Sequence, residues 1–232
     1  MNQTRYSEKQ EPGSSHDLLR KWFSGRPVGL RVLDVGTADG TLGKMLAGTG
    51  CEIVGIEPEA LWAEAARPFY QDIFIGRLED VPADFLAGKD VIVCADVLEH
   101  LPDPDVQLSR IVQLQNPETI FLICVPNVAN FWIRLQLLMG RFEYTERGIL
   151  DRTHLRFFTF SSFVELLTTS RLKPRKITPT PIPISLIFPR FFHTSLGKII
   201  QKIVCRLTIW FPRILGYQFF AVCQVSDRIE EK

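Results

Sequence analysis

Alternating strand-like and helix-like segments between residues 28 and 126 predict an α/β fold built on a doubly wound parallel sheet. The strand-like segments are continuous apolar runs, which is typical of strands that helices cover on both faces. The first of them, residues 31–35, leads directly into a glycine-containing turn and a helix-like segment. A chain of 232 residues, 46% hydrophobic and 23% charged, is large enough for one such core and an additional element.

The individual elements follow from periodicity, capping residues and helix breakers. We expect strands over residues 31–35, 51–56, 72–76, 90–95, 119–125, 173–178 and 217–225, and helices over residues 16–23, 41–46, 58–67, 104–114, 131–139, 163–169 and 195–211. Ser14 and Ser15 would cap the first helix, and Ser161 and Ser162 the helix that follows them.

Three prolines, at positions 179, 181 and 183, are expected to interrupt regular structure and to begin a separate segment. We therefore divide the chain into an N-terminal tail and helix (1–27), the sheet domain (28–178 and 216–226), a basic helical insertion or lid (179–215) and a tail (227–232). The polar N-terminus lacks the apolar core of a signal peptide, and no run of eighteen apolar residues is present, so we expect a cytoplasmic protein.

The turn after the first strand has the features of a cofactor loop. Gly36 and Gly40 allow a tight turn and let a ligand approach where a Cβ atom would block it. The free N–H groups of the turn and of the next helix would face the crevice at the carboxyl ends of the strands, where open α/β sheets bind ligands.

Glu57 ends the neighbouring strand, where an acidic side chain can accept both hydroxyls of a ribose. Alternatively, it is a solvated carboxylate that interacts favourably with the dipole of the following helix. A dinucleotide and an adenosyl cofactor are both compatible with these features. The nicotinamide fingerprint requires Gly-x-Gly-x-x-Gly, however, whereas this loop reads Gly36-Thr-Ala-Asp-Gly40.

Four segments resemble the class I S-adenosylmethionine-dependent methyltransferases, and among them the subgroup that includes the ubiquinone-biosynthesis O-methyltransferases. They are LDVGTADG (33–40), DVIVCADVLEHLPDP (90–104), Val125-Pro126-Asn127 and DRTHLRFFT (151–159). Ala38 stands where this family has a middle glycine. The resemblance covers residues 28–172 and the last strand, and it implies a seven-stranded sheet whose last strand is antiparallel.

The resemblance also implies the cofactor, S-adenosylmethionine, and its contacts. Asp34, Gly36 and Gly40 would hold the methionine portion, Glu57 the ribose and Leu78 with its neighbours the adenine. The cofactor-binding residues that it implies are Asp34, Gly36, Thr37, Ala38, Gly40, Glu57, Pro58, Leu78, Glu79, Ala95, Asp96 and Val97. Asp96 would lie near the sulfonium. Arg77 stands where the family usually has an acidic residue for the adenine amino group, so either Glu79 or Asp80 would replace it or the contact would be missing.

A sulfonium is already an activated methyl donor, so the protein has to align the reactants and remove a proton from a hydroxyl acceptor. His100, which follows the fourth strand, and His154, in the loop before a helix, are the candidate bases. In the alternative interpretation, Glu99 and His100 form a structural bond to the backbone and His154 only packs or caps. We expect at least one of the two histidines to reach the acceptor.

The helix over 195–211 carries Leu196, Ile199, Ile200, Ile203, Val204, Leu207 and Phe211 on one face and Lys198, Lys202 and Arg206 on the other. No acidic residue occurs between Leu166 and Ser226. A core-packing helix is one interpretation. The basic and aromatic surroundings favour contact with an anionic membrane surface through residues 184–215 and an acceptor that is small or lipid-linked, with the protein peripheral on the inner face.

The leading hypothesis is therefore an S-adenosylmethionine-dependent O-methyltransferase. An inactive methyltransferase-like binding protein and, less favoured, an NAD-dependent oxidoreductase are the alternatives. The five cysteines are odd in number and widely spaced, and no Cys-x-x-Cys or His-x-x-x-His spacing is present, so the sequence predicts neither disulfides nor a metal site. No nucleic-acid-binding motif is present, so we expect no nucleic-acid partner.

Overall fold

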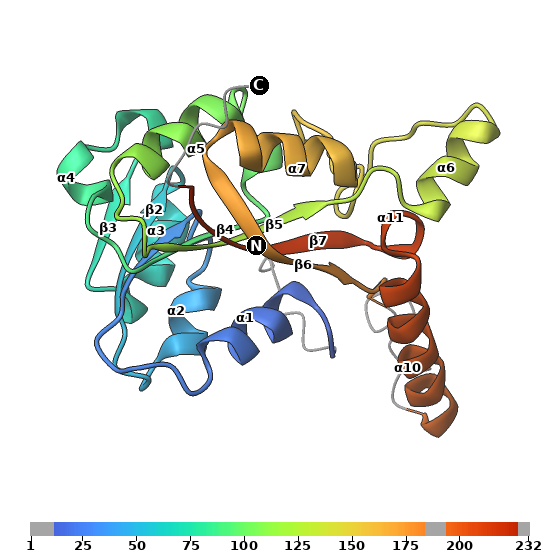
Figure 1. The fold of residues 1–232 in the computed structure, drawn as a ribbon, viewed down its shortest axis with the longest axis horizontal. Helices are drawn as coiled ribbons and strands as arrows, with labels where there is room; N and C mark the ends of the chain where they lie inside the picture. Colours follow the sequence, from blue (N-terminus) through green and yellow to red (C-terminus); the bar gives the residue numbers. More distant parts are fainter. Residues whose placement is uncertain (1–11, 184–193, 227–232) are drawn as a thin grey trace.

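The computed structural model describes residues 12–183 and 194–226, and its centre is a seven-stranded sheet (Figure 1). The strands are β1 (Arg31–Val35), β2 (Glu52–Glu57), β3 (Asp72–Ile75), β4 (Val91–Ala95), β5 (Ile120–Pro126), β6 (Leu172–Thr180) and β7 (Gln218–Val225). Their order is β3-β2-β1-β4-β5-β7-β6, and β7 runs antiparallel to both neighbours. The predicted fold class is confirmed.

Helices cover both faces of the sheet, as the continuous apolar strands require. One face carries α1 (Ser15–Phe23), α2 (Thr41–Leu46) and α3 (Ala60–Ala66), and the other carries α4 (Ala83–Leu86), α5 (Pro104–Gln113) and α7 (Phe160–Thr169) (Figure 1). Leu19 and Leu42 lie in the core on the first face, and Leu108 and Phe163 lie in the core on the second. Each core buries one side of the same strands.

Two predicted helix starts are wrong by a few residues. The helix after β2 begins at Ala60 rather than Pro58, because the backbone stays extended to Glu59, whose N–H donates to the Glu57 carboxylate. The helix predicted over 163–169 begins at Phe160. Its N-cap is Thr159, which forms a capping box with Ser162, so the two serines lie in the first turn.

The prediction that Pro179 interrupts regular structure is also wrong, because β6 continues to Thr180. This strand lies at the edge of the sheet, where proline is tolerated. The short helices α4 and α11 (Pro212–Leu215) were not predicted, since four residues carry too little periodicity to detect.

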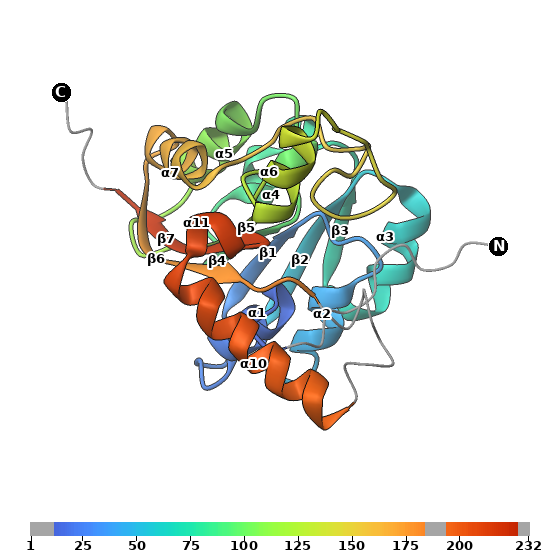
Figure 2. The same cartoon turned by 90° about the vertical axis from the view of Figure 1, so that its right-hand side faces the viewer.

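The carboxyl ends of the parallel strands lie on the side of the molecule that faces the viewer in Figure 2. Three helices stand on this side: α6 (Phe131–Leu138), α10 (Ser195–Trp210) and α11. Asn127 and Asn130 tie α6 to α11, because both side-chain amides donate to the carbonyl oxygen of Gly216, at 2.8 and 2.9 Å. No helix within residues 12–183 or 194–226 has the length and hydrophobicity needed to cross a membrane.

Candidate functional site

A cavity of about 600 Å³ opens at the carboxyl ends of β1, β2 and β4. Most of the predicted cofactor residues line it: Asp34, Gly36, Thr37, Ala38, Glu57, Pro58, Leu78, Glu79, Ala95, Asp96 and Val97. His100 lines it as well, whereas Gly40 and His154 do not. The structure therefore gathers residues from three strand ends around one cavity.

Gly36 keeps the mouth of this cavity open. Its φ is +80°, a conformation that favours glycine, and an added Cβ would lie 2.6 Å from Cγ2 of Val97, which lines the same cavity. The N–H groups of Gly36 and Thr37 donate to the carbonyl oxygen of Ile56 at 2.9 and 3.1 Å, which fixes the loop against β2. Ala38 adopts φ +47°, so the position of the missing middle glycine keeps a left-handed backbone.

Gly40 has a packing role in addition to the cofactor contact that the resemblance implies. It is the N-cap of α2 with φ +86°, and an added Cβ would lie 2.9 Å from the Cα atom of Ala66. This glycine therefore allows α2 to pack closely on α3. It also sets the position of the loop that does line the cavity.

Asp34 lies buried at the base of the loop and accepts a 2.5 Å hydrogen bond from the hydroxyl of Tyr70. That hydroxyl in turn accepts from the N–H of Gly43 in α2 at 3.1 Å. Burial raises the pKa of Asp34 to about 7, although the Tyr70 hydrogen bond opposes the rise and nearby Glu57 adds to it. The position and the protonation of Asp34 thus both depend on Tyr70.

Both oxygens of the buried Glu57 carboxylate are oriented by backbone donors. Oε2 accepts from the N–H of Ala38 at 2.8 Å, and Oε1 accepts from the N–H of Glu59 at 3.1 Å. Burial raises the pKa of Glu57 despite these two hydrogen bonds. A carboxylate has about four acceptor sites, so Glu57 can still accept two hydroxyl groups from a ligand.

The electrostatics of this end of the cavity favour a particular kind of ligand. Asp34 and Glu57 are two buried acids whose pKa values are raised mainly by burial, and Arg77, which also lines the cavity, pairs with Glu79 at 3.2 Å. A ligand that brings positive charge or hydroxyl donors would restore favourable interactions to both acids. A diphosphate would add negative charge beside them.

Asp96 lies at the exit of β4 with a left-handed backbone, at φ +58°. The side-chain amide of Gln218, on β7, donates to its Oδ1 atom, and its own N–H donates to the carbonyl oxygen of Cys124 at 3.0 Å. The antiparallel last strand therefore orients a side chain in the middle of the cavity.

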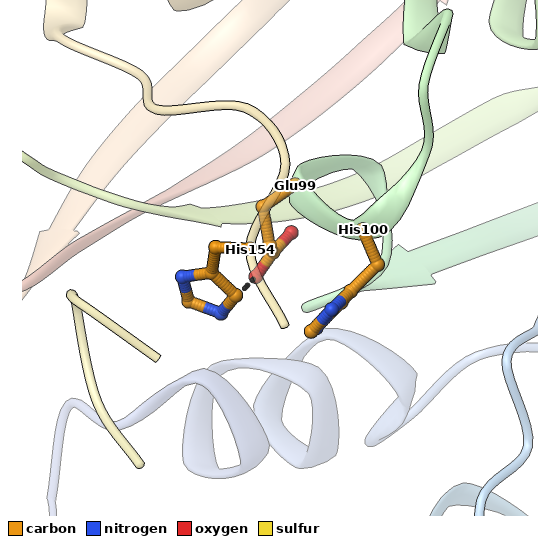
Figure 3. Close-up of side chains that lie close together, drawn as sticks. All are labelled: Glu99, His100 and His154. Carbon is orange, nitrogen blue, oxygen red and sulfur yellow. Dashed lines mark ion pairs between the residues drawn. The ribbon is translucent and has the colours of Figure 1, made fainter. Parts of the chain in front are cut away.

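The second end of the cavity is the part that follows β4, on the other side of β1 from Glu57. His100 lines this end, and His154 lies beside His100 (Figure 3). His100 ends the short helix η3 (Leu98–His100) and is half-buried, whereas His154 is only 9% exposed and lies behind it. The two rings meet edge to face with centroids 4.8 Å apart. The structure thus brings both histidines together but gives only His100 a place on the cavity wall.

Backbone carbonyls determine the tautomers of the two imidazoles. Nδ1 of His100 lies 3.2 Å from both the carbonyl oxygen and the hydroxyl of Thr153, and that hydroxyl donates to Oδ1 of Asp151 at 2.7 Å. Nδ1 of His154 lies 3.0 Å from the carbonyl oxygen of Ile149. Because these oxygens are placed to accept, the arrangement favours a hydrogen on each Nδ1 and leaves Nε2 as the basic atom of each neutral ring. Burial lowers the pKa of His154, so this ring is neutral near pH 7.

Glu99 connects the strand exit to the loop that carries His154. Its carbonyl oxygen accepts from the N–H groups of Leu155 and Arg156 at 2.8 and 3.0 Å, and its carboxylate, 1% exposed, lies 4.0 Å from Nε2 of His154 (Figure 3). The alternative interpretation is that Glu99 and His100 bond to the backbone for structural reasons. These contacts agree with it for Glu99, whose main chain holds the loop in place.

One ligand atom each from Glu99, His100 and His154 lies within 4.8 Å of the others. Imidazole nitrogen and carboxylate oxygen are common ligands of divalent transition metals, and an Nδ1–H bound to a carbonyl is the usual support of a metal-binding imidazole. These residues could therefore hold a cation. No short ligand spacing in the sequence indicates this group, because His154 lies in a loop far along the chain from Glu99 and His100.

Several residues of the cavity wall were not predicted: His16 and Leu19 of α1, Trp62 of α3, and Thr153 and Leu155 of the His154 loop. Tyr70, which holds Asp34, was also missed. Trp62 lies in the first turn of α3, close in sequence to Glu57, so its position offered a signal. The others reach the cavity only through the packing of distant segments, which no local pattern reports.

The strand order, the antiparallel last strand and a cavity over β1 and β2 define a Rossmann-like, cofactor-binding α/β protein. The chain matches the family model described as "Methyltransferase domain" over residues 6–173, and it belongs to that family. The resemblance to class I methyltransferases is thereby confirmed.

Curated relatives refine this similarity. Ubiquinone biosynthesis O-methyltransferase of Salmonella paratyphi A is 27% identical over 164 residues, which cover 67% of this chain and 66% of the relative. The enzyme of the same name from Xanthomonas axonopodis pv. citri is 30% identical over 97 residues, which cover 39% of this chain and 41% of the relative. The chain thus spans less than two thirds of the length of these relatives.

Solved structures show the same fold. Magnesium protoporphyrin IX methyltransferase of Synechocystis PCC 6803, with bound SAH, has a TM-score of 0.61 at 15% identity, over 90% of this chain and 81% of the other. A SAM-dependent methyltransferase of Archaeoglobus fulgidus has a TM-score of 0.57 at 16% identity, over 92% and 95% of the two chains.

Proposed function

We propose that this protein is an S-adenosylmethionine-dependent methyltransferase that methylates an oxygen atom of a small or lipid-linked acceptor. One observation carries the proposal: a single cavity is lined by two buried carboxylates, from the ends of β1 and β2, and by a half-buried histidine that follows β4. The acidic end suits a cofactor with a sulfonium, an ammonium group and ribose hydroxyls. The histidine end suits a hydroxyl that has to lose a proton.

At the donor end, Glu57 would accept the two ribose hydroxyls, and the loop over Asp34 and Gly36 would hold the methionine portion. Thr37, Ala38, Pro58 and Ala95 complete the wall, and Asp96 and Val97 would lie beside the sulfur. Leu78 and Glu79 would contact the adenine. Glu79 lines the cavity and Asp80 does not, which favours Glu79 as the replacement acid.

At the acceptor end, His100 is the better candidate for the base. Its Nδ1–H is held by Thr153, so Nε2 is available to take a proton from an acceptor hydroxyl in the cavity. His154 is buried behind it and would act as a positioning residue. The methyl group would then pass in line from sulfur to the acceptor oxygen.

A second arrangement of the same end is favoured by the cluster of Glu99, His100 and His154. A divalent cation bound there would lower the pKa of a coordinated acceptor hydroxyl, so that the histidines would act as ligands instead of bases. To distinguish a histidine base from a bound cation, methyl transfer is measured before dialysis against EDTA, after it, and again after addition of Mg²⁺, Mn²⁺ or Zn²⁺. Loss and recovery of activity support the cation, and unchanged activity supports the histidine base.

Contact with an anionic membrane surface through residues 184–215 belongs to the same proposal. Of this segment, residues 184–193 lie outside the described residues, and α10 and α11 occupy most of the remainder. A peripheral protein of this kind would meet a lipid-linked acceptor at the surface of the bilayer.

Titration calorimetry with S-adenosylmethionine, S-adenosylhomocysteine and NAD tests the cofactor. We expect binding of the first two and no heat from NAD, whereas binding of NAD alone would indicate an oxidoreductase. Transfer of label from methyl-labelled S-adenosylmethionine to a cell lipid extract or a small-molecule fraction tests the reaction. Cofactor binding without transfer to any fraction would indicate an inactive binding protein.

A further inference from the structure

Helix α10 places its polar side against the domain and its apolar side toward solvent. Gln201 and Thr208 are 3% and 1% exposed, and Gly197, in the first turn of the helix, is also buried. The opposite row is apolar and between 42% and 78% exposed, and it consists of Leu196, Ile199, Ile203, Leu207 and Trp210. A helix that only packed on its own domain would show the reverse pattern. The core-packing interpretation of this helix is therefore wrong.

Burial of the inner side of α10 stabilises the helix little. Oε1 of Gln201 and Oγ1 of Thr208 are buried without a hydrogen-bond partner in the described part of the chain. Burying such groups unpaired is unfavourable, and so is leaving a row of large apolar side chains in water. The helix would be favourable in this orientation if something apolar covered its outer side.

Three exposed cations flank the apolar row. Lys198, Lys202 and Arg206 are four residues apart, so they form one row along the helix next to Ile199, Ile203 and Leu207. None of the three has an acidic partner among the ion pairs of the described residues, and no Asp or Glu occurs between Leu166 and Ser226. The uncovered surface of α10 is thus apolar along its centre and purely cationic along one edge.

We propose that α10 binds an anionic lipid bilayer, with its axis in the plane of the membrane and the row from Leu196 to Trp210 inserted among the lipids. The cationic row would contact lipid phosphates, and the buried row of Gly197, Gln201 and Thr208 would hold the helix to the domain. Trp210, the most exposed member of the row, has the amphipathic ring that membrane interfaces favour. This inference rests on the proposed function. If the protein methylates an amphiphilic acceptor, binding to the bilayer would bring the enzyme to that acceptor.

The position and charge of α10 favour a bilayer over a second copy of the chain. The helix lies on the side of the molecule that contains the carboxyl ends of the parallel strands (Figure 2). The cavity opens at these strand ends. Docking through α10 would therefore bring that side close to the membrane. A symmetric pair of α10 helices would instead bring the cationic rows of both copies together, with no acidic residue of the segment to neutralise them.

Cosedimentation of the full chain with vesicles tests the proposal. We expect binding to phosphatidylcholine vesicles that contain phosphatidylglycerol, weaker binding at high salt, and little binding to pure phosphatidylcholine. The double variant Ile203→Glu, Leu207→Glu should lower the partition coefficient by about tenfold or more, and Lys202→Ala should lower it by about fivefold at low salt. Trp210→Phe should remove most of the blue shift of tryptophan fluorescence that vesicles cause.

Val106→Glu is the matched control, because it adds a charge at an exposed apolar site on α5, away from α10. It should bind vesicles like the unchanged chain. Equal binding of the α10 double variant and the control would overturn the proposal. A dimer in sedimentation that the double variant dissociates, without vesicle binding, would overturn it in favour of a second copy.

Calorimetry with S-adenosylhomocysteine on the same variants tests the proposed methyltransferase function separately from membrane binding by α10. Retained cofactor binding shows that a variant is folded, so a loss of vesicle binding then belongs to α10. Absence of cofactor binding in the unchanged chain would contradict the proposed function, while leaving the vesicle result to decide the role of α10.

Discussion

The two ends of the cavity are built in different ways. The donor end is local: Asp34 lies near the end of β1, Gly36 follows that strand, Glu57 ends β2, and the two strands are adjacent. The acceptor end is assembled over long distances, since His100 follows β4 and the loop of His154 docks on it through the backbone of Glu99. We therefore expect variants at the donor end to change cofactor affinity, and variants at the acceptor end to change turnover.

The largest effect is expected at Gly36. Gly36→Val should abolish binding of S-adenosylhomocysteine in calorimetry, because the new side chain would meet Val97 and fill the space over the loop. Gly48→Val is the control: Gly48 has a similar φ of +79° but nothing within 4 Å of an added Cβ. If Gly36→Val still binds the cofactor while folded, the donor end is not where we place it.

At the acceptor end, His100→Ala should lower kcat by about 10²- to 10⁴-fold, the usual contribution of a general base. Affinity for S-adenosylhomocysteine should stay within about twofold, since the hydrogen bonds of His100 go to Thr153 and not to Asp34 or Glu57. His154→Ala, which removes a buried ring tied to Ile149, should have a smaller effect on kcat and a measurable effect on the melting temperature. Equal losses of kcat in both variants would support joint binding of a cation.

Asp34 should make the stability of the ligand-free protein depend on pH. Burial raises its pKa from 3.8 to about 7 in the folded state. The contribution of protonated Asp34 to the free energy of unfolding is therefore fully present below pH 3.8 and is lost as the pH rises to 7. The loss could reach about 4 kcal/mol in the free energy of unfolding, at about 1.4 kcal/mol per pKa unit. Asp34→Asn should remove this decline in denaturant titrations between pH 4 and 8. Asp39→Asn, in the same loop, should leave it unchanged.

The smallest of these effects is expected at Glu57. Glu57→Ala should weaken binding of S-adenosylhomocysteine by about 1.5–3 kcal/mol, the range for hydrogen bonds to a charged group. Glu52→Ala, at the exposed start of the same strand, serves as the control. Unchanged affinity in Glu57→Ala would mean that its carboxylate only holds the N–H groups of Ala38 and Glu59 and does not reach a ribose.

The same contrast explains which parts of the site the sequence could predict. Strand ends, glycines and the acid at position 57 leave local patterns, and all of these lie where the sheet topology requires. Tyr70 and His16 reach the site only because α1 and the segment before β3 pack against it, and no periodicity reports such a contact. The cluster around Glu99 was missed for the same reason, since its third member lies in a distant loop.

Helix α10 shows a further limit. Its periodicity correctly predicted a helix with an apolar and a cationic face, and an amphipathic helix normally packs its apolar face inward. Only the structure reveals that Gln201 and Thr208 face the domain while Ile203 and Leu207 face out. A hydrophobic pattern reports that one face differs from the other, and it does not report which environment each face meets.

A crystal structure with bound S-adenosylhomocysteine tests the central claim most directly. We predict that both ribose hydroxyls lie within hydrogen-bonding distance of the Glu57 carboxylate and that the sulfur points past Asp96 toward His100. A cofactor bound outside this cavity, or one whose adenine lies against His100 and whose sulfur lies at the far end, would contradict the division into a donor end and an acceptor end.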